Sequence, residues 1–231
     1  MTTGEGGDLV HGQLSRRAGS RPLSGGAVGS RAATTTTTGG ARHIGILLFD
    51  VMEELDAIGP WEVFAWWTRH FPGDGYTATT FSSDGRPVTC EKGLVVQPHH
   101  SIATVPPLDV LLHPGGDGTQ AMLTDRAHLA WLCEQRAHVP LVTSVCTGST
   151  VLAAAGLLHG RPATSNRGAL EQLGSIDPTI TVRPGERFVD DGDVITSAGI
   201  SAGIDMALHI VGRLAGPERA EQVREGIEYA P

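Results

Sequence analysis

Short apolar runs recur along the chain and are separated by longer segments with a different spacing. The runs at 43–49, 108–113 and 140–145 are almost wholly apolar, which is typical of parallel strands buried on both faces. Further short strands are predicted at 76–82, 94–96, 162–165, 179–183, 187–189 and 194–197.

Helical spacing of apolar residues appears between the strands. The first such segment is 53–67, where Gly59-Pro60 predicts a break, with Pro60 in the first turn of a helix. Alternating strands and helices predict a largely parallel sheet covered on both faces, with functional sites at the carboxyl ends of the strands. Further helices are predicted over 119–137, from Ser149 to a stop at 156–160, over 201–215 and over 217–229.

The first 41 residues differ from the rest of the chain. They are rich in Gly, Ser, Thr and Arg and nearly free of large apolar residues, so we expect a disordered extension over 1–41. The absence of an apolar core segment excludes a secretory signal, while an organelle transit peptide stays as an alternative. Residues 42–231 are predicted to form one domain.

Composition narrows the classes of function. The formal net charge is −8 and the basic residues are scattered, which argues against a nucleic-acid partner. No apolar run is long enough for a membrane span. Three cysteines without a CxxC pair argue against a disulfide framework or a zinc site, and His99-His100 lacks a third ligand. We therefore expect a cytoplasmic protein without a metal or other cofactor.

Cys146 lies between a predicted strand and a predicted helix. A nucleophile at such a turn is exposed to substrate, and a helix N-terminus favours a thiolate, so we expect Cys146 to be partly ionised near neutral pH. The alternative is a buried structural cysteine. Cys90 and Cys133 have no comparable position.

Glycines follow two of the predicted strands. The backbone N–H groups of Gly115 and Gly116, with Thr147 and Gly148 beside Cys146, are candidates to hold an anion or a developing negative charge. A simple tight turn is the alternative interpretation.

Asp56 is the acid–base candidate, in the loop predicted after the first strand. Its competitors are Glu53, Glu54 and Glu62, and a helix N-cap is the alternative role. His113 ends a strand and could reach the same region, although a buried structural role is favoured.

A series of segments runs in order from His43 to Pro231: HIGILLFD, LDAIGPWEVF, LLHPGG, SVCTGSTVLAAAGLLHGRPAT, FVDDGDVITSAGISAGIDMALHIV and IEYAP. Together they resemble the DJ-1/PfpI superfamily, and within it the isonitrile hydratase branch. The resemblance implies a flavodoxin-like, doubly wound, mainly parallel α/β sandwich, as in class I glutamine amidotransferases, and a homodimer.

The resemblance also implies a chemistry. Members of this branch add water to an isonitrile, R–NC, and form an N-substituted formamide without a cofactor. The family's catalytic cysteine falls on Cys146, the adjacent threonine on Thr147 and the essential aspartate on Asp56. A Cys146 thiolate would attack the isonitrile carbon and Asp56 would supply a proton and then help water add, with Thr147 positioning substrate or water.

Two features of the sequence concern which branch of the superfamily the chain resembles. Amidotransferases and PfpI-like peptidases tend to carry a Cys-His pair at this turn, whereas Thr147 follows the cysteine here. Relatives in the hydratase branch usually have a Thr-His-Trp-like run where this chain has Thr164-Ser165-Asn166-Arg167, in a segment that lines the family's pocket. This departure from the family pattern leaves both the size of the substrate and the activity itself undecided.

Other functions share the same domain. Cys146 could serve as a redox or stress sensor, or the chain could be glyoxalase-like. The domain is also the ligand-sensing half of some AraC-type regulators, which continue into a helix-turn-helix region. This chain ends at Pro231 without a basic tail, so we do not expect a DNA-binding regulator.

Overall fold

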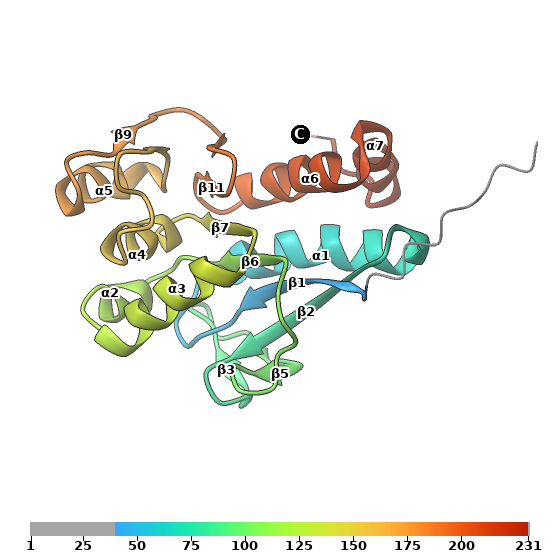
Figure 1. Cartoon of the computed structure of the whole chain (residues 1–231), viewed down its shortest axis with the longest axis horizontal. Coiled ribbons are helices and arrows are strands. Elements are labelled where there is room, and N and C mark those ends of the chain that lie inside the picture. Colours follow the sequence, from blue (N-terminus) through green and yellow to red (C-terminus); the bar gives the residue numbers. More distant parts are fainter. Residues whose placement is uncertain (1–39, 231) are drawn as a thin grey trace, which may run out of the picture. The chain divides into compact units, whose positions relative to one another are not determined.

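A central seven-stranded sheet organises the protein (Figure 1). The computed structural model describes residues 40–230, so the predicted disorder of 1–41 falls almost entirely outside the described residues. All neighbouring strands are parallel except the antiparallel pair β10–β11. The order across the sheet is β10 (Phe188–Asp190), β11 (Val194–Ser197), β7 (Leu141–Val145), β6 (Val110–His113), β1 (Arg42–Leu47), β2 (Tyr76–Ser82) and β5 (His100–Ser101).

Helices cover both faces of this sheet (Figure 1). One layer packs α1 (Glu54–His70), α6 (Ala202–Ala215) and α7 (Pro217–Gly226) together. The other contains α2 (Thr119–Met122), α3 (Arg126–His138), α4 (Gly148–Ala154) and α5 (Leu170–Ile176). The predicted flavodoxin-like sandwich is confirmed. Within residues 40–230, no helix has both the length and the apolar character that a membrane span requires.

The core explains why the apolar runs form central strands. Ile44 and Ile46 of β1 and Leu111 and Leu112 of β6 are fully buried, because helices cover the sheet above and below them. Two small two-stranded sheets lie outside it. They pair β3 (Val88–Thr89) with β4 (Val95–Val96), and β8 (Pro162–Ala163) with β9 (Thr181–Val182).

The start of α1 corrects the interpretation of Gly59-Pro60. The helix begins at Glu54, so Pro60 lies inside it rather than in its first turn. A Cβ on Gly59 would lie 2.9 Å from Ile204, which shows how closely α1 approaches α6 at this point. Gly59-Pro60 is therefore a packing contact between two helices, and the first turn of α1 comes earlier in the chain, from Glu54.

Four further elements differ from the expectation. The helix predicted over 119–137 is divided into α2 and α3, because the Asp125 side chain accepts the N–H groups of Ala127 and His128 and starts a new helix. The short helix α5 and the strands β3 and β5 were not predicted. Each is only a few residues long and carries little periodicity.

Candidate active site

Cys146 occupies the turn between β7 and α4, as the sequence predicted. Its backbone φ is +57°, a conformation that a residue with a side chain seldom adopts. Such strain persists only where the surrounding structure imposes it, and it is common at functional sites. The residue is 5% exposed, so little of it is in contact with solvent.

Hydrogen bonds hold this strained backbone on both sides. The hydroxyls of Ser149 and Ser165 donate to the Cys146 carbonyl at 3.1 and 3.0 Å. The Cys146 N–H donates to the carbonyls of Ser197 and Ala198 at 3.2 and 3.3 Å. The two buried serines come from different segments, and together they hold the Cys146 carbonyl in place.

We expect the double variant Ser149→Ala/Ser165→Ala to relax the turn at Cys146. Each neutral hydrogen bond contributes about 1 kcal/mol, so alkylation of the Cys146 thiol by iodoacetamide should slow by roughly tenfold or more. Ser144→Ala is the matched control, since the buried Ser144 hydroxyl has no hydrogen-bond partner among the described residues. Equal alkylation rates in the double variant and the control would contradict this role.

Asp56 lies in the first turn of α1, which corrects its expected place in a loop. It is fully buried, and its Oδ2 accepts the Gly115 N–H at 2.9 Å. Its Oδ1 has no hydrogen bond of normal geometry among the described residues. The Ile200 N–H and the Cys146 thiol are near enough to favour the carboxylate. Asp56 is therefore not an N-cap but a buried carboxyl group beside the cysteine.

The competing carboxylates have other roles or positions. Lys92 forms ion pairs with Glu53 and Glu54, and Glu62 is exposed on α1. The Glu53 charge nevertheless acts on Asp56 by disfavouring its ionised form.

The pKa values of Asp56 and Cys146 differ from those expected if Cys146 rested as a thiolate. Burial, and then the charge of Glu53, raise the pKa of Asp56 to about 7, against the opposing Gly115 hydrogen bond. Burial, and then the charge of Asp56, raise the pKa of Cys146 to about 12, although Asn166 and the Thr147 N–H favour its thiolate. The prediction of a partly ionised Cys146 is wrong, because the desolvation and the neighbouring carboxylate outweigh the helix N-terminus.

The glycines of the two loops are needed for close packing and do not supply free N–H groups. Gly115 donates to Asp56, and Gly116 donates to the Thr147 hydroxyl at 2.9 Å, so neither N–H is free as an anion site. A Cβ on Gly115 would lie 2.5 Å from the Thr147 nitrogen, and one on Gly148 would lie 2.3 Å from the His113 carbonyl oxygen. The glycines let the two loops meet without side chains between them.

The Thr147 hydroxyl is likewise engaged within the protein. It accepts from Gly116 and from the Thr119 hydroxyl at 3.1 Å and can donate to the Gly116 carbonyl at 3.3 Å. Its side chain therefore ties the two loops together instead of facing a substrate. The Thr147 backbone N–H is the group that lies next to the Cys146 sulfur.

A cavity of about 400 Å³ is lined by residues within 164–170, 185–187 and 198–201, and neither Cys146 nor Asp56 lines it directly. Ser165 and Asn166 line it and also contact Cys146, through its carbonyl and its thiol respectively. These two residues were singled out only because they depart from the family pattern. Their contacts with Cys146 could not be inferred from spacing, since they lie about twenty residues further along the chain.

Two β-branched residues beside the site also have a left-handed backbone. Val51 follows β1 at φ +61° and Ile200 follows β11 at φ +57°. Both positions are costly for β-branched side chains. At Ile200 this conformation accompanies the approach of its N–H to Asp56. Backbone strain therefore occurs at three loops around the carboxyl edge of the sheet.

Other cysteines and potential ligands lie apart from this chemistry. Cys90 is buried, and the exposed Cys133 donates to the Ala155 carbonyl at 3.2 Å. Across residues 40–230, no group of three or more His, Cys, Asp or Glu side chains is arranged to hold a metal ion.

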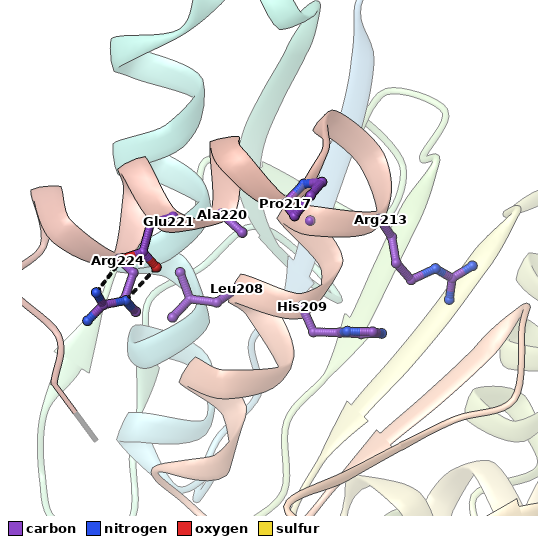
Figure 2. A pocket seen from close by; sticks show the side chains of 8 residues that line it. Leu208, His209, Arg213, Pro217, Ala220, Glu221 and Arg224 are labelled. Carbon is purple, nitrogen blue, oxygen red and sulfur yellow. Dashed lines mark hydrogen bonds and ion pairs between the residues drawn. The ribbon is translucent and has the colours of Figure 1, made fainter.

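A second hollow, of about 480 Å³, lies between α6 and α7 (Figure 2). Arg224 pairs with Glu221, and His209 and Arg213 both pair with Asp190. Its charged side chains are thus engaged with one another or with Asp190, and no nucleophile lies in it. The candidate catalytic groups, Cys146 and Asp56, lie elsewhere, in contact with residues that line the smaller cavity.

Comparisons with known proteins find relatives by sequence and by fold. Isonitrile hydratase from Pseudomonas putida is 39% identical over 192 residues, which cover 83% of this chain and 80% of that protein. The transcriptional regulator CdhR from Pseudomonas aeruginosa is 33% identical over 77% of this chain, which spans about half (51%) of the regulator's length. The crystal structure of a THiJ/PfpI family protein from Pseudomonas syringae superposes with a TM-score of 0.72 at 32% identity, covering 91% of this chain and 84% of that one.

The family assignment rests on most of the chain. Residues 42–213 match the profile of the DJ-1/PfpI family, from the first strand to the last turn of α6. The match includes the Cys146 turn, the Asp56 helix and the loop of Gly115. The chain therefore belongs to the DJ-1/PfpI family.

Proposed function

We propose that this protein adds water to an isonitrile and releases an N-substituted formamide, with no cofactor. The observation that carries the proposal is the fully buried Asp56 carboxyl beside the thiol of Cys146, whose backbone has a strained φ. Residues that contact this pair, Asn166 and Ile200 among them, line a cavity. The similarity to the Pseudomonas putida hydratase supports the choice of substrate.

The first half of the proposed reaction adds the thiol across the isonitrile carbon. Asp56, as a carboxylate, takes the proton of the Cys146 thiol while the sulfur attacks that carbon. The same proton then passes from Asp56 to the carbon, which gives a thioimidate, R–N=CH–S–Cys. One shared proton is sufficient, so the pair acts from its singly protonated form.

The second half returns the enzyme to its starting state. Asp56 removes a proton from the incoming water as the water attacks the thioimidate carbon. Asp56 passes this proton to the nitrogen, and collapse of the adduct then breaks the C–S bond. The hydroxyl proton of the adduct returns to the Cys146–Asp56 pair as R–NH–CHO leaves. The sum is R–NC plus water, and Cys146 and Asp56 again hold one proton between them.

The regulator similarity favours a second candidate, a ligand-sensing domain that uses the same cavity without turnover. It predicts that an isonitrile or other small molecule binds and shifts the melting temperature but gives no product. A redox sensor is less well supported, because the Cys146 thiol is buried and its raised pKa disfavours the oxidisable thiolate. Glyoxalase-like turnover of a 2-oxoaldehyde is tested in the same assay.

We further propose a cytoplasmic homodimer. Several large apolar side chains are exposed near the site, on the loop after β1, the start of α1, the β3–β4 hairpin and the loop before α6, namely Val51, Leu55, Leu94, Val95 and Ile200. A second copy covering these side chains would remove apolar area from water. Light scattering should give twice the chain mass of 24.2 kDa; the mass of a single chain would exclude the dimer.

The function is tested by supplying the purified protein with a panel of alkyl and aryl isonitriles and with methylglyoxal, in buffer containing a chelator. Formyl-proton signals of the formamide, followed by NMR, should appear with at least one isonitrile. Binding without formamide would favour the sensing domain, and lactate from methylglyoxal alone would favour the glyoxalase.

A further inference from the structure

His113, the last residue of β6, is fully buried directly beneath the loop that contacts Asp56. Its ring lies 5.5 Å from that of Phe49 and packs edge-on against His128 of α3. Both ring nitrogens have partners: Nδ1 lies 2.7 Å from the Pro114 carbonyl oxygen and Nε2 lies 3.0 Å from His128 Nε2. The mechanism above uses neither histidine.

These contacts determine where the protons lie. A carbonyl oxygen can only accept, so His113 Nδ1 must carry a hydrogen and donate it to Pro114. Burial, with His128 beside it, lowers the pKa of His113 to about 3, so the ring is neutral and its Nε2 has a lone pair. His128 Nε2 must then be the donor to His113. Two imidazoles thus form a hydrogen-bonded chain that ends on one backbone carbonyl.

The carbonyl of Pro114 belongs to the turn that serves the site. The next residue, Gly115, donates its N–H to Asp56, and Gly116 donates to Thr147. A Cβ on Gly148 would lie 2.8 Å from the Pro114 oxygen, so this carbonyl also lies against the Cys146 loop. Rotation of the Pro114 peptide would move the Gly115 N–H away from Asp56.

We propose that His113 is a positioning residue: its Nδ1–H fixes the Pro114 peptide so that the Gly115 N–H meets Asp56, and His128 selects the required tautomer. The proposal rests on the proposed function only in that Asp56 is the acid–base group. The contact between His113 of β6 and His128 of α3 would then help to set the proton affinity of the Asp56–Cys146 pair.

The expected signature is a change in pH dependence. Asp56 is surrounded by Glu53 of the loop before α1, the Cys146 thiol and the N–H groups of Gly115 and Ile200. Of these, the Gly115 hydrogen bond is the largest influence that lowers the pKa of Asp56. If the turn loosens, this bond is lost and the pair gives up its first proton at higher pH.

The experiment measures the rate of Cys146 alkylation by iodoacetamide between pH 5 and 10, mapped by peptide mass on folded protein. We expect a rise with a midpoint near 7 in the natural protein, because above this pH the Asp56 carboxylate can take the thiol proton while the sulfur attacks iodoacetamide. In His113→Phe, which keeps the ring and removes the donor, the midpoint should rise by about one unit, with a roughly tenfold slower reaction at pH 6. His113→Asn keeps a donor at the Nδ1 position and should remain closer to the natural protein.

Three further variants keep the test decisive. Val211→Ala, in the fully buried part of α6, should lower stability without moving the midpoint. If His113→Phe fails to fold, His128→Phe should shift the midpoint upward and His128→Gln, which retains a donor, should restore it. An unchanged midpoint in the folded His113 or His128 variants would overturn the proposal, as would an equal shift in Val211→Ala.

The readout does not depend on the identity of the substrate. If no isonitrile is hydrated but the midpoints shift as described, the proposed function fails and the positioning role of His113 stands. If formamide forms but the midpoints do not move, the proposed function stands and the positioning role of His113 fails.

Discussion

Cys146→Ala should reduce formamide formation to the uncatalysed background. Removal of the atom that forms the covalent bond to substrate typically costs catalysis at least about 10⁴-fold. Removal of the thiol should leave the fold intact, because the thiol is small. The neighbouring Ser149 and Ser165 bind the Cys146 carbonyl rather than its side chain. Initial rates by NMR, together with the melting temperature of the same preparation, give both quantities.

Cys133→Ala is the matched control for this variant. Cys133 is exposed on α3 and contacts the Ala155 carbonyl, outside the proposed site. Its replacement should leave turnover unchanged. Substantial formamide formation by Cys146→Ala would show that the addition of water needs no covalent step at this thiol.

Asp56→Asn should lower turnover by about 10²–10⁴-fold while making the protein more stable above neutral pH. The loss of turnover is the usual size of a general acid–base contribution. The gain in stability has a separate cause. Asp56 has its pKa raised from 3.8 to about 7 in the folded protein by burial, so the unfolded chain releases this proton at lower pH than the folded one.

The sign of the stability change follows from this difference. Between about pH 4 and 7 the folded state holds more protons, so the free energy of unfolding falls as pH rises through this range. Above pH 7 the buried carboxylate costs the fold up to about 4 kcal/mol, at about 1.4 kcal/mol per pKa unit. The neutral amide of Asn avoids most of this cost but must find its own partners.

Thermal unfolding of both proteins at pH 5 and pH 8 measures the effect. The melting temperature of Asp56→Asn should exceed that of the natural protein at pH 8, and the difference should shrink at pH 5. A simple helix cap would instead lose about 1 kcal/mol at both pH values and keep its turnover. A variant that is less stable at pH 8, with nearly full activity, would therefore contradict the role assigned to Asp56.

The order of elements and the position of Cys146 were accessible from the sequence. Long apolar runs such as those of β1 and β7 are unambiguous, because a strand buried on both faces has few polar positions. The turn at Cys146 was marked by the change from such a run to small, helix-forming residues. Where the signal is only two or three residues long, as in β3 and β5, pattern alone could not separate a strand from a loop.

The details of the site depended on contacts between distant segments. Asp56 was expected in a loop because Gly59-Pro60 suggested a later helix start, whereas tertiary packing on α6 tolerates Pro60 within α1. The N–H groups of Gly115 and Gly116 were expected to be free, but their acceptors come from α1 and the β7–α4 turn. No local pattern encodes such pairings.

The protonation state of Cys146 illustrates the same limit. A helix N-terminus is visible in the sequence and favours a thiolate, whereas burial and the distance to a carboxylate are not visible. In the folded protein, burial and the Asp56 charge raise the pKa of Cys146. Sequence reasoning therefore named Cys146 and Asp56 as candidate groups, and the structure places them side by side with raised pKa values, which is the basis of the proposed shared proton.

The pH dependence of kcat/KM for isonitrile hydration, measured from pH 5 to 10, tests this shared proton most directly. The active form holds one proton on the Asp56–Cys146 pair, so kcat/KM should rise through the Asp56 pKa of about 7 and stay level up to pH 10, because the second proton leaves only near the Cys146 pKa of about 12. In Asp56→Asn the step near pH 7 should disappear. A kcat/KM that falls as pH rises through 7, or a step near 7 that survives in Asp56→Asn, would contradict the account.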